Sequence, residues 1–275
     1  MATRVAINGF GRIGRLVYRA ILESNNDEIK VVCINDLGSA RDNAHLLKFD
    51  STHGILPQNI KVVGDTMDAG QGPVRVTAER NPANLPWKEL NVDIALECTG
   101  FFASKEKASA HIEAGAKRVI ISAPADGADI TVVYGVNSDQ ITDHHTVISN
   151  ASCTTNCLAP VAYVLNNAVG IERGFMTTIH SFTGDQRTVD TLHSDLHRAR
   201  TASASMIPTS TGAAKAVGLV LPELNGKLDG TSVRVPTPNV SLIDFTFTPG
   251  KKTSVEEIND AISAAAASGS LKGIL

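Results

Sequence analysis

The chain has few of the residues that mark several classes of protein. Among its 275 residues are only four cysteines and one tryptophan, and aromatic residues make up 4% of the total. Four cysteines in a chain of this length do not form a disulfide scaffold, which indicates a reducing, cytoplasmic setting. No apolar run reaches the length of a membrane-spanning helix, and the N-terminus lacks the pattern of a signal peptide.

Charged residues are also sparse, and the two signs are mixed. They make up 19% of the chain, the formal net charge is -3, and no long run of one sign occurs. There is no basic patch with interleaved aromatic residues, so the sequence does not predict specific nucleic-acid binding. Internal repeats and low-complexity segments are absent. A chain that is 43% hydrophobic can bury a sizeable core, and its length suits two domains.

Strand and helix patterns alternate in the first half of the chain. The run at residues 29–35 is apolar almost throughout, as expected for a parallel strand that is covered on both faces. This alternation predicts a doubly wound α/β domain over residues 1–150. The expected strands are 4–8, 29–35, 92–97, 118–122, 131–136 and 146–149, and the expected helices include 11–24 and 104–114.

The second half, residues 151–275, predicts a separate α+β domain. Its first helix begins at Cys153 and contains Pro160, which predicts a kink. Two late strands are joined by a short Pro-Thr-Pro segment, which indicates an antiparallel sheet. The expected elements are helices at 153–167, 212–220 and 254–267, strands at 175–180, 232–235 and 239–248, and a polar segment at 181–205.

A glycine fingerprint follows the first strand. Gly9, Gly11 and Gly14 fit G-x-G-x-x-G at the start of a helix, and the next strand ends in Asp36. Gly9 allows a tight turn, Gly11 lets the backbone approach a pyrophosphate, and Gly14 permits close packing of helix on strand. Asp36 is placed to accept hydrogen bonds from ribose hydroxyls and would repel a 2′-phosphate. The pattern therefore predicts an NAD site and favours NAD over NADP.

The run Ser-Cys-Thr-Thr-Asn-Cys at residues 152–157 is the most informative feature. It places Cys153 where a strand leads into a helix, and backbone N–H groups at a helix start favour a thiolate. A thiolate that attacks an aldehyde needs a base. His180 ends a predicted strand and opens a polar segment, so it is the leading candidate. Position alone does not single it out, because the chain has eight histidines.

The other three cysteines predict structural roles. Cys33 and Cys98 lie in apolar strand-like runs and are expected to be small core residues. Cys157 follows Cys153 by one helical turn. A redox pair or a metal site is conceivable there, but no neighbouring Cys/His pair completes a zinc ligand set. We therefore expect no metal, and Cys157 to be packed inward.

Arginines and hydroxyl residues in the second half predict anion binding. Arg198, Arg200 and Arg234 carry guanidinium groups of the kind that hold phosphate oxygens. The Thr-Ser-Thr-Gly run at 209–212 precedes a helix and has the character of an anion cradle, although simple helix capping would explain it equally well.

Several motifs together identify a family likeness. The segments 8–15, 151–157, 180–186, 208–215 and 234–240 together resemble phosphorylating glyceraldehyde-3-phosphate dehydrogenases, and the likeness runs over the whole chain. The resemblance implies a Rossmann-type dinucleotide-binding domain followed by a catalytic domain with a mixed or antiparallel sheet. It also implies NAD-dependent conversion of D-glyceraldehyde 3-phosphate and inorganic phosphate to 1,3-bisphosphoglycerate, by a cytoplasmic homotetramer.

The resemblance assigns a role to each site residue. Cys153 would form a hemithioacetal and then a thioester, with His180 as its activator and base. The residues expected at the NAD site are Gly9, Gly11, Arg12, Ile13, Gly14, Asp36, Arg80, Thr99, Gly100 and Ser122. Thr183, Arg198 and Arg234 would hold the substrate's phosphate. Ser152, Thr154, Thr211 and Gly212 would hold the inorganic phosphate that cleaves the thioester.

Three alternatives follow from the same residues. An erythrose-4-phosphate dehydrogenase would share the thiol and the histidine but release its thioester mainly to water. A cysteine hydrolase would use the same pair and leave the glycine fingerprint without a function. A non-catalytic NAD-binding fragment is the third, because the family resemblance implies several dozen further residues at the C-terminus, including an Asn that contacts the nicotinamide. On this expectation the catalytic domain is C-terminally truncated.

Overall fold

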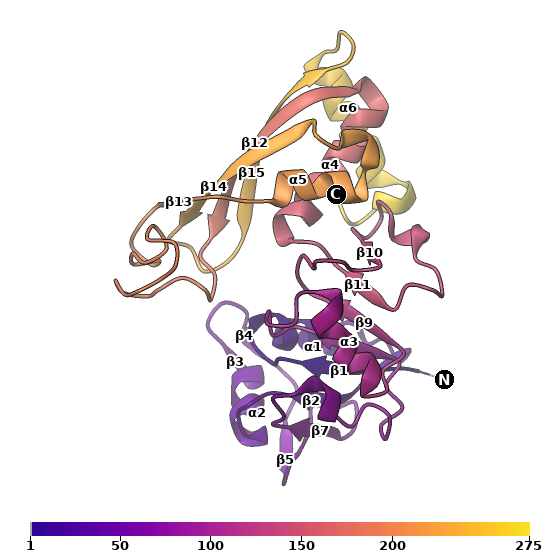
Figure 1. Ribbon diagram of the computed structural model, residues 1–275, viewed down its shortest axis with the longest axis vertical. Helices are drawn as coiled ribbons and strands as arrows, with labels where there is room; N and C mark the ends of the chain where they lie inside the picture. Colours follow the sequence, from indigo (N-terminus) through magenta and orange to yellow (C-terminus); the bar gives the residue numbers. More distant parts are fainter. Residues whose placement is uncertain (1) are drawn as a thin grey trace. The chain divides into compact units, whose positions relative to one another are not determined.

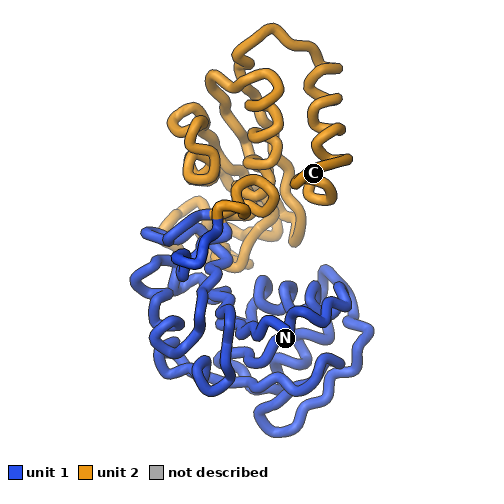
Figure 2. Tube along the Cα trace, turned by 90° about the vertical axis from the view of Figure 1, so that its right-hand side faces the viewer, with its two compact units in different colours: residues 1–131, 141–150 blue, residues 132–140, 151–275 orange. Residues whose placement is uncertain are grey.

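The computed structural model describes residues 2–275, which form two compact units (Figure 2). The first unit takes in the chain up to Thr131 together with Ile141–Asn150, and the second takes in Val132–Gln140 together with Ala151–Leu275. The segment Val132–Gln140 thus belongs to the second unit, although it precedes the boundary expected at residue 150. Nowhere in residues 2–275 is there a helix long and apolar enough to cross a bilayer.

The first unit is built on one largely parallel sheet (Figure 1). The strand order is β10-β11-β9-β8-β1-β2-β7-β6-β5, and only β5 and β6 join by antiparallel pairing. Its strands are β1 (Thr3–Asn8), β2 (Ile29–Asn35), β5 (Lys61–Val63), β6 (Thr66–Asp68), β7 (Val74–Thr77), β8 (Ile94–Glu97), β9 (Arg118–Ile121), β10 (Ile130–Thr131) and β11 (Val147–Ser149). Its α-helices are α1 (Arg12–Ser24), α2 (Ala40–Lys48) and α3 (Lys105–Glu113), with a small separate sheet of β3 (Phe49–Asp50) and β4 (Gly54–Ile55).

Helices cover both faces of this sheet, as a doubly wound fold requires. Successive residues of a strand point to opposite faces, and Ala6 and Ile7 of β1 accordingly belong to two different apolar clusters. Tyr18 of α1 and Leu47 of α2 pack with Ile7, whereas Ala108 of α3 packs in the cluster of Ala6. The α/β architecture predicted from the alternation of elements is confirmed.

The second unit has a four-stranded mixed sheet in the order β13-β14-β12-β15. The strands are β12 (Ile171–Ser181), β13 (Ile207–Thr209), β14 (Leu228–Val235) and β15 (Ser241–Pro249), and the α-helices are α4 (Cys153–Val169), α5 (Ala213–Val220) and α6 (Val255–Ala267). Helices α4 and α5 bury Leu158, Ala162 and Val217 in the core of this unit. Helix α4 includes Pro160 and continues to Val169, so this proline does not end the helix.

Two expectations about strands were wrong. We expected β14 and β15 to pair with each other because a short segment joins them. In the structure β12 lies between them, parallel to β14 and antiparallel to β15. The strand expected over 131–136 is also absent, since β10 ends at Thr131 and a short 3-10 helix, Ser138–Gln140, follows within the next segment. In that segment Asn137 accepts a hydrogen bond from the backbone N–H of Val133 at 2.9 Å, which stabilises a turn rather than a strand.

Candidate active site

Helix α4 begins at the predicted nucleophile. Ser152 is the N-cap, and its hydroxyl accepts a hydrogen bond from the backbone N–H of Thr155 at 3.1 Å. The residue before it, Ala151, has a positive φ of 53°, so the chain turns sharply into the helix. Cys153 is the first helical residue and its side chain is exposed. The thiol therefore lies at the positive end of a 17-residue helix, within reach of solvent and reactants.

His180 lies next to this thiol. Its Nε2 is 3.0 Å from the Sγ of Cys153, although the two residues are 27 positions apart in the chain. The Nδ1 atom is 2.7 Å from the carbonyl oxygen of Ser181. Because a carbonyl oxygen only accepts, Nδ1 carries the proton, and Nε2 is left to accept from the S–H or, once protonated, to donate to the thiolate. The same geometry thus suits both states of the pair.

The two groups shift each other's pKa in opposite directions. The hydrogen bond from His180 lowers the pKa of Cys153 below its ordinary value, against the effect of burial, and the backbone N–H of Thr154 acts in the same direction as His180. The same hydrogen bond raises the pKa of His180, again against burial, with help from the Ser181 carbonyl. Such a pair favours a thiolate–imidazolium couple, which is an activated nucleophile beside a base.

The remaining cysteines differ from Cys153, and one of them, Cys157, differs from expectation. Cys33 is fully buried, as predicted. Cys98 packs against the apolar cluster of Ile7, as expected of a small core residue, but it is only partly buried because it also lines a cavity. Cys157 is exposed and not packed inward, because the face of α4 that carries Cys153 is open to solvent in this unit. Burial raises the pKa of Cys33 and of Cys98 to about 11. Partial desolvation at the surface, together with the nearby charge of Cys153, raises the pKa of Cys157.

These pKa directions predict how fast iodoacetate alkylates each thiol. We expect Cys153 to react first, with a rate that rises with pH around a midpoint below the ordinary thiol value of 9.0. Asparagine at His180 removes the lowering hydrogen bond, so the midpoint should move up in that variant. Peptide mass spectrometry of timed reactions from pH 5 to pH 10 measures this, with Cys33 as the internal control. Equal rates at Cys153 and Cys33 in the folded protein would contradict it.

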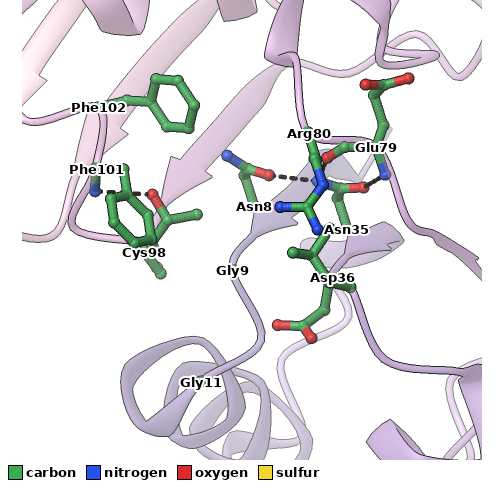
Figure 3. A pocket seen from close by; sticks show the side chains of 12 residues that line it. Asn8, Gly9, Gly11, Asn35, Asp36, Glu79, Arg80, Cys98, Phe101 and Phe102 are labelled. Carbon is green, nitrogen blue, oxygen red and sulfur yellow. Dashed lines mark hydrogen bonds between the residues drawn. The ribbon is translucent and has the colours of Figure 1, made fainter. Parts of the chain in front are cut away.

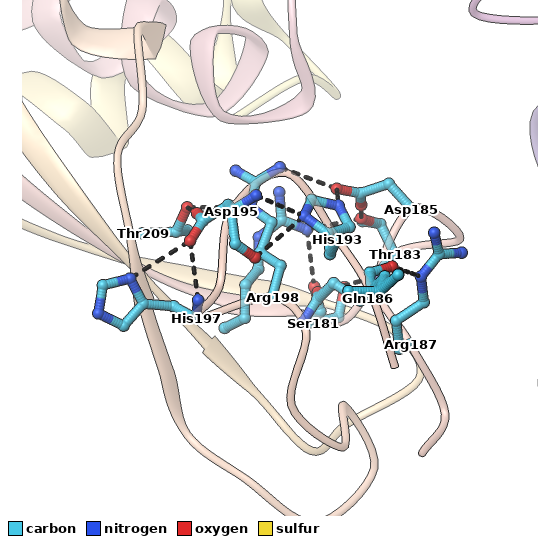
Figure 4. Close-up of polar contacts among 12 residues, drawn as sticks. Ser181, Thr183, Asp185, Gln186, Arg187, His193, Asp195, His197, Arg198 and Thr209 are labelled. Carbon is cyan, nitrogen blue, oxygen red and sulfur yellow. Dashed lines mark hydrogen bonds and ion pairs between the residues drawn. The ribbon is translucent and has the colours of Figure 1, made fainter. Parts of the chain in front are cut away.

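The three residues assigned to the substrate phosphate, Thr183, Arg198 and Arg234, form one polar cluster. Figure 4 shows Thr183 and Arg198 in it. Arg234, which pairs with His180 across β14 and β12, donates from Nη1 to the hydroxyl of Thr183 at 2.9 Å. Thr183 in turn makes a very short hydrogen bond to Asp185, and Arg198 donates from Nη1 to Asp185 at 2.8 Å. Burial alone would raise the pKa of Asp185, but Thr183 and Arg198 outweigh it and the pKa is lowered. Sequence reasoning missed Asp185, which joins the three predicted residues.

Both arginines of this cluster make hydrogen bonds, but Arg234 also has a buried N–H group without an acceptor among residues 2–275. The Nε of Arg234 is buried and makes no hydrogen bond within the described residues. The Nε of Arg198 donates to Thr209 at 3.0 Å and lies 3.6 Å from Asp195. Burial lowers the pKa of Arg234, while Asp185 acts in the opposite direction. A buried donor that lacks a partner favours an incoming anion, because desolvating it without one is costly. Arg200, by contrast, is paired with Asp190 and does not join these contacts.

The residues assigned to inorganic phosphate lie at the starts of two helices. Ser152 caps α4, and the hydroxyl of Thr211 accepts from the backbone N–H of Ala213 at 3.2 Å at the start of α5. The hydroxyl of Thr155 donates to the carbonyl oxygen of Ala213 at 3.3 Å, which joins the two helix starts. A side chain on Gly212 would meet no atom within 4 Å, so this backbone is accessible. Two converging helix N-termini suit an anion.

In the first unit, the glycine loop has the features that a dinucleotide requires. Gly9 has a φ of +90°, which favours glycine, and a Cβ there would lie 2.7 Å from the backbone nitrogen of Thr99. A Cβ on Gly14 would lie 2.2 Å from the carbonyl oxygen of Gly9, whereas a Cβ on Gly11 would meet nothing within 4 Å. Asp36 accepts from the backbone N–H of Phe10 at 2.8 Å and so holds the loop. The residues therefore fit the group that the fingerprint predicts.

A cavity of about 510 Å³ opens beside this loop (Figure 3). Five predicted cofactor residues line it, and five others are not among its lining residues. The lining ones are Gly9, Gly11, Asp36, Arg80 and Thr99, and the others are Arg12, Ile13, Gly14, Gly100 and Ser122. The Arg12 guanidinium is paired with Asp50, Ile13 is 49% exposed, and Ser122 contacts the thiol of Cys98. Asn8, Asn35 and Phe101 also line the cavity, and only their positions at or after strand ends could have indicated this.

Within residues 2–275 there is no group of three or more His, Cys, Asp or Glu side chains that could hold a metal ion.

Comparisons with known proteins match both units. The profile described as glyceraldehyde 3-phosphate dehydrogenase, NAD binding domain, matches residues 3–105, and the profile of the C-terminal domain of the same enzymes matches residues 152–275. The chain is 70% identical to the glyceraldehyde-3-phosphate dehydrogenase of Xanthobacter flavus and 64% identical to that of Cereibacter sphaeroides. It is 58% identical to that of Geobacillus stearothermophilus. Each alignment covers the whole chain and 82% of the relative.

Proposed function

The chain belongs to the glyceraldehyde-3-phosphate dehydrogenase family, and we propose that Cys153 and His180 carry out its reaction. That reaction is the NAD-dependent oxidation of D-glyceraldehyde 3-phosphate, with inorganic phosphate, to 1,3-bisphosphoglycerate. The observation that carries the assignment is the 3.0 Å contact between Sγ and Nε2 at the start of α4. The relatives' shared name does not favour the erythrose-4-phosphate alternative.

The chemistry of the pair follows from its geometry. The thiolate of Cys153 attacks the aldehyde carbon, and the oxyanion that forms takes a proton from the Nε2 of His180 to give a hemithioacetal. The neutral Nε2 then takes this hydroxyl proton back as the hydride leaves the carbon. NAD held at the glycine loop, beside residues such as Gly9 and Asp36, would supply the acceptor for the hydride that the hemithioacetal carbon loses. The product of that loss is a thioester on Cys153. With its Nδ1 proton held by the Ser181 carbonyl, His180 keeps Nε2 directed at the sulfur throughout.

The two anion sites supply positioning. Thr183, Arg198 and Arg234 are proposed to hold the substrate's own phosphate, with the unpartnered Nε of Arg234 as one donor. Substrate phosphate would then compete with Asp185 for Thr183 and Arg198. Ser152, Thr154, Thr211 and Gly212 are proposed to hold the inorganic phosphate that attacks the thioester. The converging starts of α4 and α5 support this assignment.

The cofactor is proposed to bind at the glycine loop and the cavity beside it. Gly9, Gly11, Asp36, Arg80 and Thr99 would line its site, with Gly14 as the packing residue under the loop. Arg12, Ile13, Gly100 and Ser122 would approach it from the surrounding surface. We also propose that the protein is a cytoplasmic homotetramer, as the family resemblance implies. Light scattering of the purified protein tests this oligomeric state.

The test is formation of NADH from glyceraldehyde 3-phosphate, NAD and phosphate. We expect sustained turnover only when all three are present. A burst of NADH that stops near one equivalent per site without phosphate would support the thioester, because inorganic phosphate is the group that cleaves it. Sustained turnover without phosphate would favour release to water, and calorimetry that detects no NAD binding would overturn the proposal.

Removing the charge of Asp36 should shift the preference between NAD and NADP. Asparagine at this position keeps an oxygen that accepts from the Phe10 N–H, but it no longer repels a 2′-phosphate. At the effective dielectric of a protein surface, a like-charge contact of this kind is worth on the order of 1–3 kcal/mol. We expect the ratio of the Kd for NADP to that for NAD to fall by about 10-fold or more.

Calorimetric titration of both dinucleotides measures this ratio. The matched control is Asp27→Asn, which removes the same charge from an exposed position of the same unit and should leave the ratio unchanged. A ratio in Asp36→Asn that equals that of the control would show that Asp36 does not select the cofactor.

A further inference from the structure

Three buried polar side chains, those of Glu97, His111 and Trp87, are hydrogen-bonded in series beneath the cavity of the first unit, and the proposed reaction does not use them. Glu97, at the end of β8, is 1% exposed, and His111 of α3 and Trp87 are fully buried. The indole Nε1 of Trp87 donates to Nδ1 of His111 at 2.9 Å, and Nε2 of His111 lies 3.0 Å from Oε2 of Glu97. The two rings meet edge to edge and are nearly coplanar, with an interplanar angle of 21°.

The hydrogen bonds of these three side chains determine which atom of His111 carries the proton. An indole N–H can only donate, so Nδ1 of His111 must accept and carries no proton. His111 is therefore neutral with its proton on Nε2, which donates to Glu97. The other donors to the side chain of Glu97 are the amide of Asn8, at 2.6 Å, and both the backbone N–H and the hydroxyl of Thr99, at 2.7 Å and 2.5 Å. Since every group around it donates, Glu97 is a buried carboxylate held by neutral donors.

This series of hydrogen bonds continues along the carboxyl ends of parallel strands. Asn8, which ends β1, accepts from the amide of Asn35, which ends β2, at 2.7 Å. Asn35 accepts in turn from the backbone N–H of Glu79 and the hydroxyl of Thr77, both at 2.8 Å. Four residues that take part in these hydrogen bonds also line the cavity, namely Asn8, Asn35, Glu79 and Thr99. Figure 3 shows the first three of them at its wall. The carboxyl ends of parallel strands are where such folds bind ligands.

We propose that Glu97, His111 and Trp87 form a positioning network for the dinucleotide site. Glu97 fixes Asn8 and Thr99 at the cavity wall, and His111 and Trp87 fix the carboxylate from behind. The inference rests on the proposed NAD site. It adds three residues that do not line the cavity and that would set its affinity by holding those that do. Trp87 is the only tryptophan of the chain, so its indole reports the state of the network.

Glutamine at position 97 is the direct test. It has nearly the size of glutamate, but its amide is itself a donor, so it must oppose a donor at Asn8, His111 or Thr99. Leaving a buried donor unpaired in this way should weaken NAD binding on the order of 10- to 100-fold in Kd. The matched control is Glu89→Gln, which removes the same charge from the same unit at an exposed side chain paired with Arg75. We expect its Kd to stay within about twofold of wild type.

A second variant and a second measurement keep the test independent of folding. Trp87→Phe keeps an aromatic ring but removes the indole N–H that donates to Nδ1 of His111, and we expect a several-fold weaker Kd for NAD. In the unmodified protein, selective ¹⁵N labelling of tryptophan yields one indole N–H signal. We expect it to exchange slowly with solvent and to shift on addition of NAD, with the same midpoint as calorimetry.

The possible results separate the two claims. If unmodified protein does not bind NAD in calorimetry, the proposed cofactor site fails and this network fails with it. Only the network is overturned if unmodified protein binds NAD and Glu97→Gln binds it with the wild-type Kd. A cooperative urea transition shows that this variant is folded. An indole signal that does not move at saturating NAD overturns the network even where Glu97→Gln does not fold. Weakened binding in Glu97→Gln together with a shifting indole signal supports it.

Discussion

Replacing Cys153 by serine should abolish NAD reduction by glyceraldehyde 3-phosphate while NAD affinity stays within about twofold. A serine hydroxyl is not appreciably ionised at neutral pH, whereas the contact with His180 and the start of α4 favour the thiolate. Loss of a covalent nucleophile costs on the order of 10⁴-fold or more in rate. Initial rates of NADH formation, together with calorimetric titration of NAD, measure the two effects separately.

The control for this variant is Cys157→Ser. Cys157 lies one turn along α4, is also exposed, and has a raised pKa, so it should contribute little to the reaction. We expect its turnover to stay within a few-fold of the unmodified chain. Turnover in Cys153→Ser within tenfold of wild type would remove the covalent mechanism from consideration.

The elements of this chain follow from local patterns, whereas the pairing of the second sheet does not. Strand β2 has the predicted limits, 29–35, because an apolar run covered on both faces is a strong local signal. By contrast, β14 and β15 are adjacent in sequence but separated in the sheet by β12. Which strand occupies the middle position depends on the packing of the whole unit, and the period of the individual strands carries no information about it.

The candidate site was predictable only in part. Local sequence indicates Cys153 at a helix start, but the partnership with His180 joins residues 27 positions apart and was supported by the family resemblance. The environment of each cysteine was harder still, since Cys98 lines a cavity besides packing against the core and Cys157 is exposed. Their exposure depends on how distant segments pack. Asp185 lay in a polar segment with no periodic pattern, so nothing marked it as the partner of Arg198.

Asparagine at His180 should lower turnover by on the order of 10²–10⁴-fold at neutral pH, because two functions are lost together. The variant has no base to take the hydroxyl proton of the hemithioacetal. It also lacks the hydrogen bond that lowers the pKa of Cys153, so a smaller share of the thiol is ionised. Rates of NADH formation from pH 6 to pH 10 separate these two losses.

The pH dependence of the deficit has a definite sign. The wild-type thiol has a lowered pKa and ionises at lower pH than the variant's thiol. As pH rises through the higher value of the variant, its thiolate recovers, so the deficit should shrink. The part that persists at high pH measures the loss of the base. A deficit that is constant across this range would mean that His180 does not ionise the thiol, and an unchanged rate would move the role of base to another residue. His197→Asn, at an exposed histidine of the same unit, is the matched control and should keep the wild-type profile.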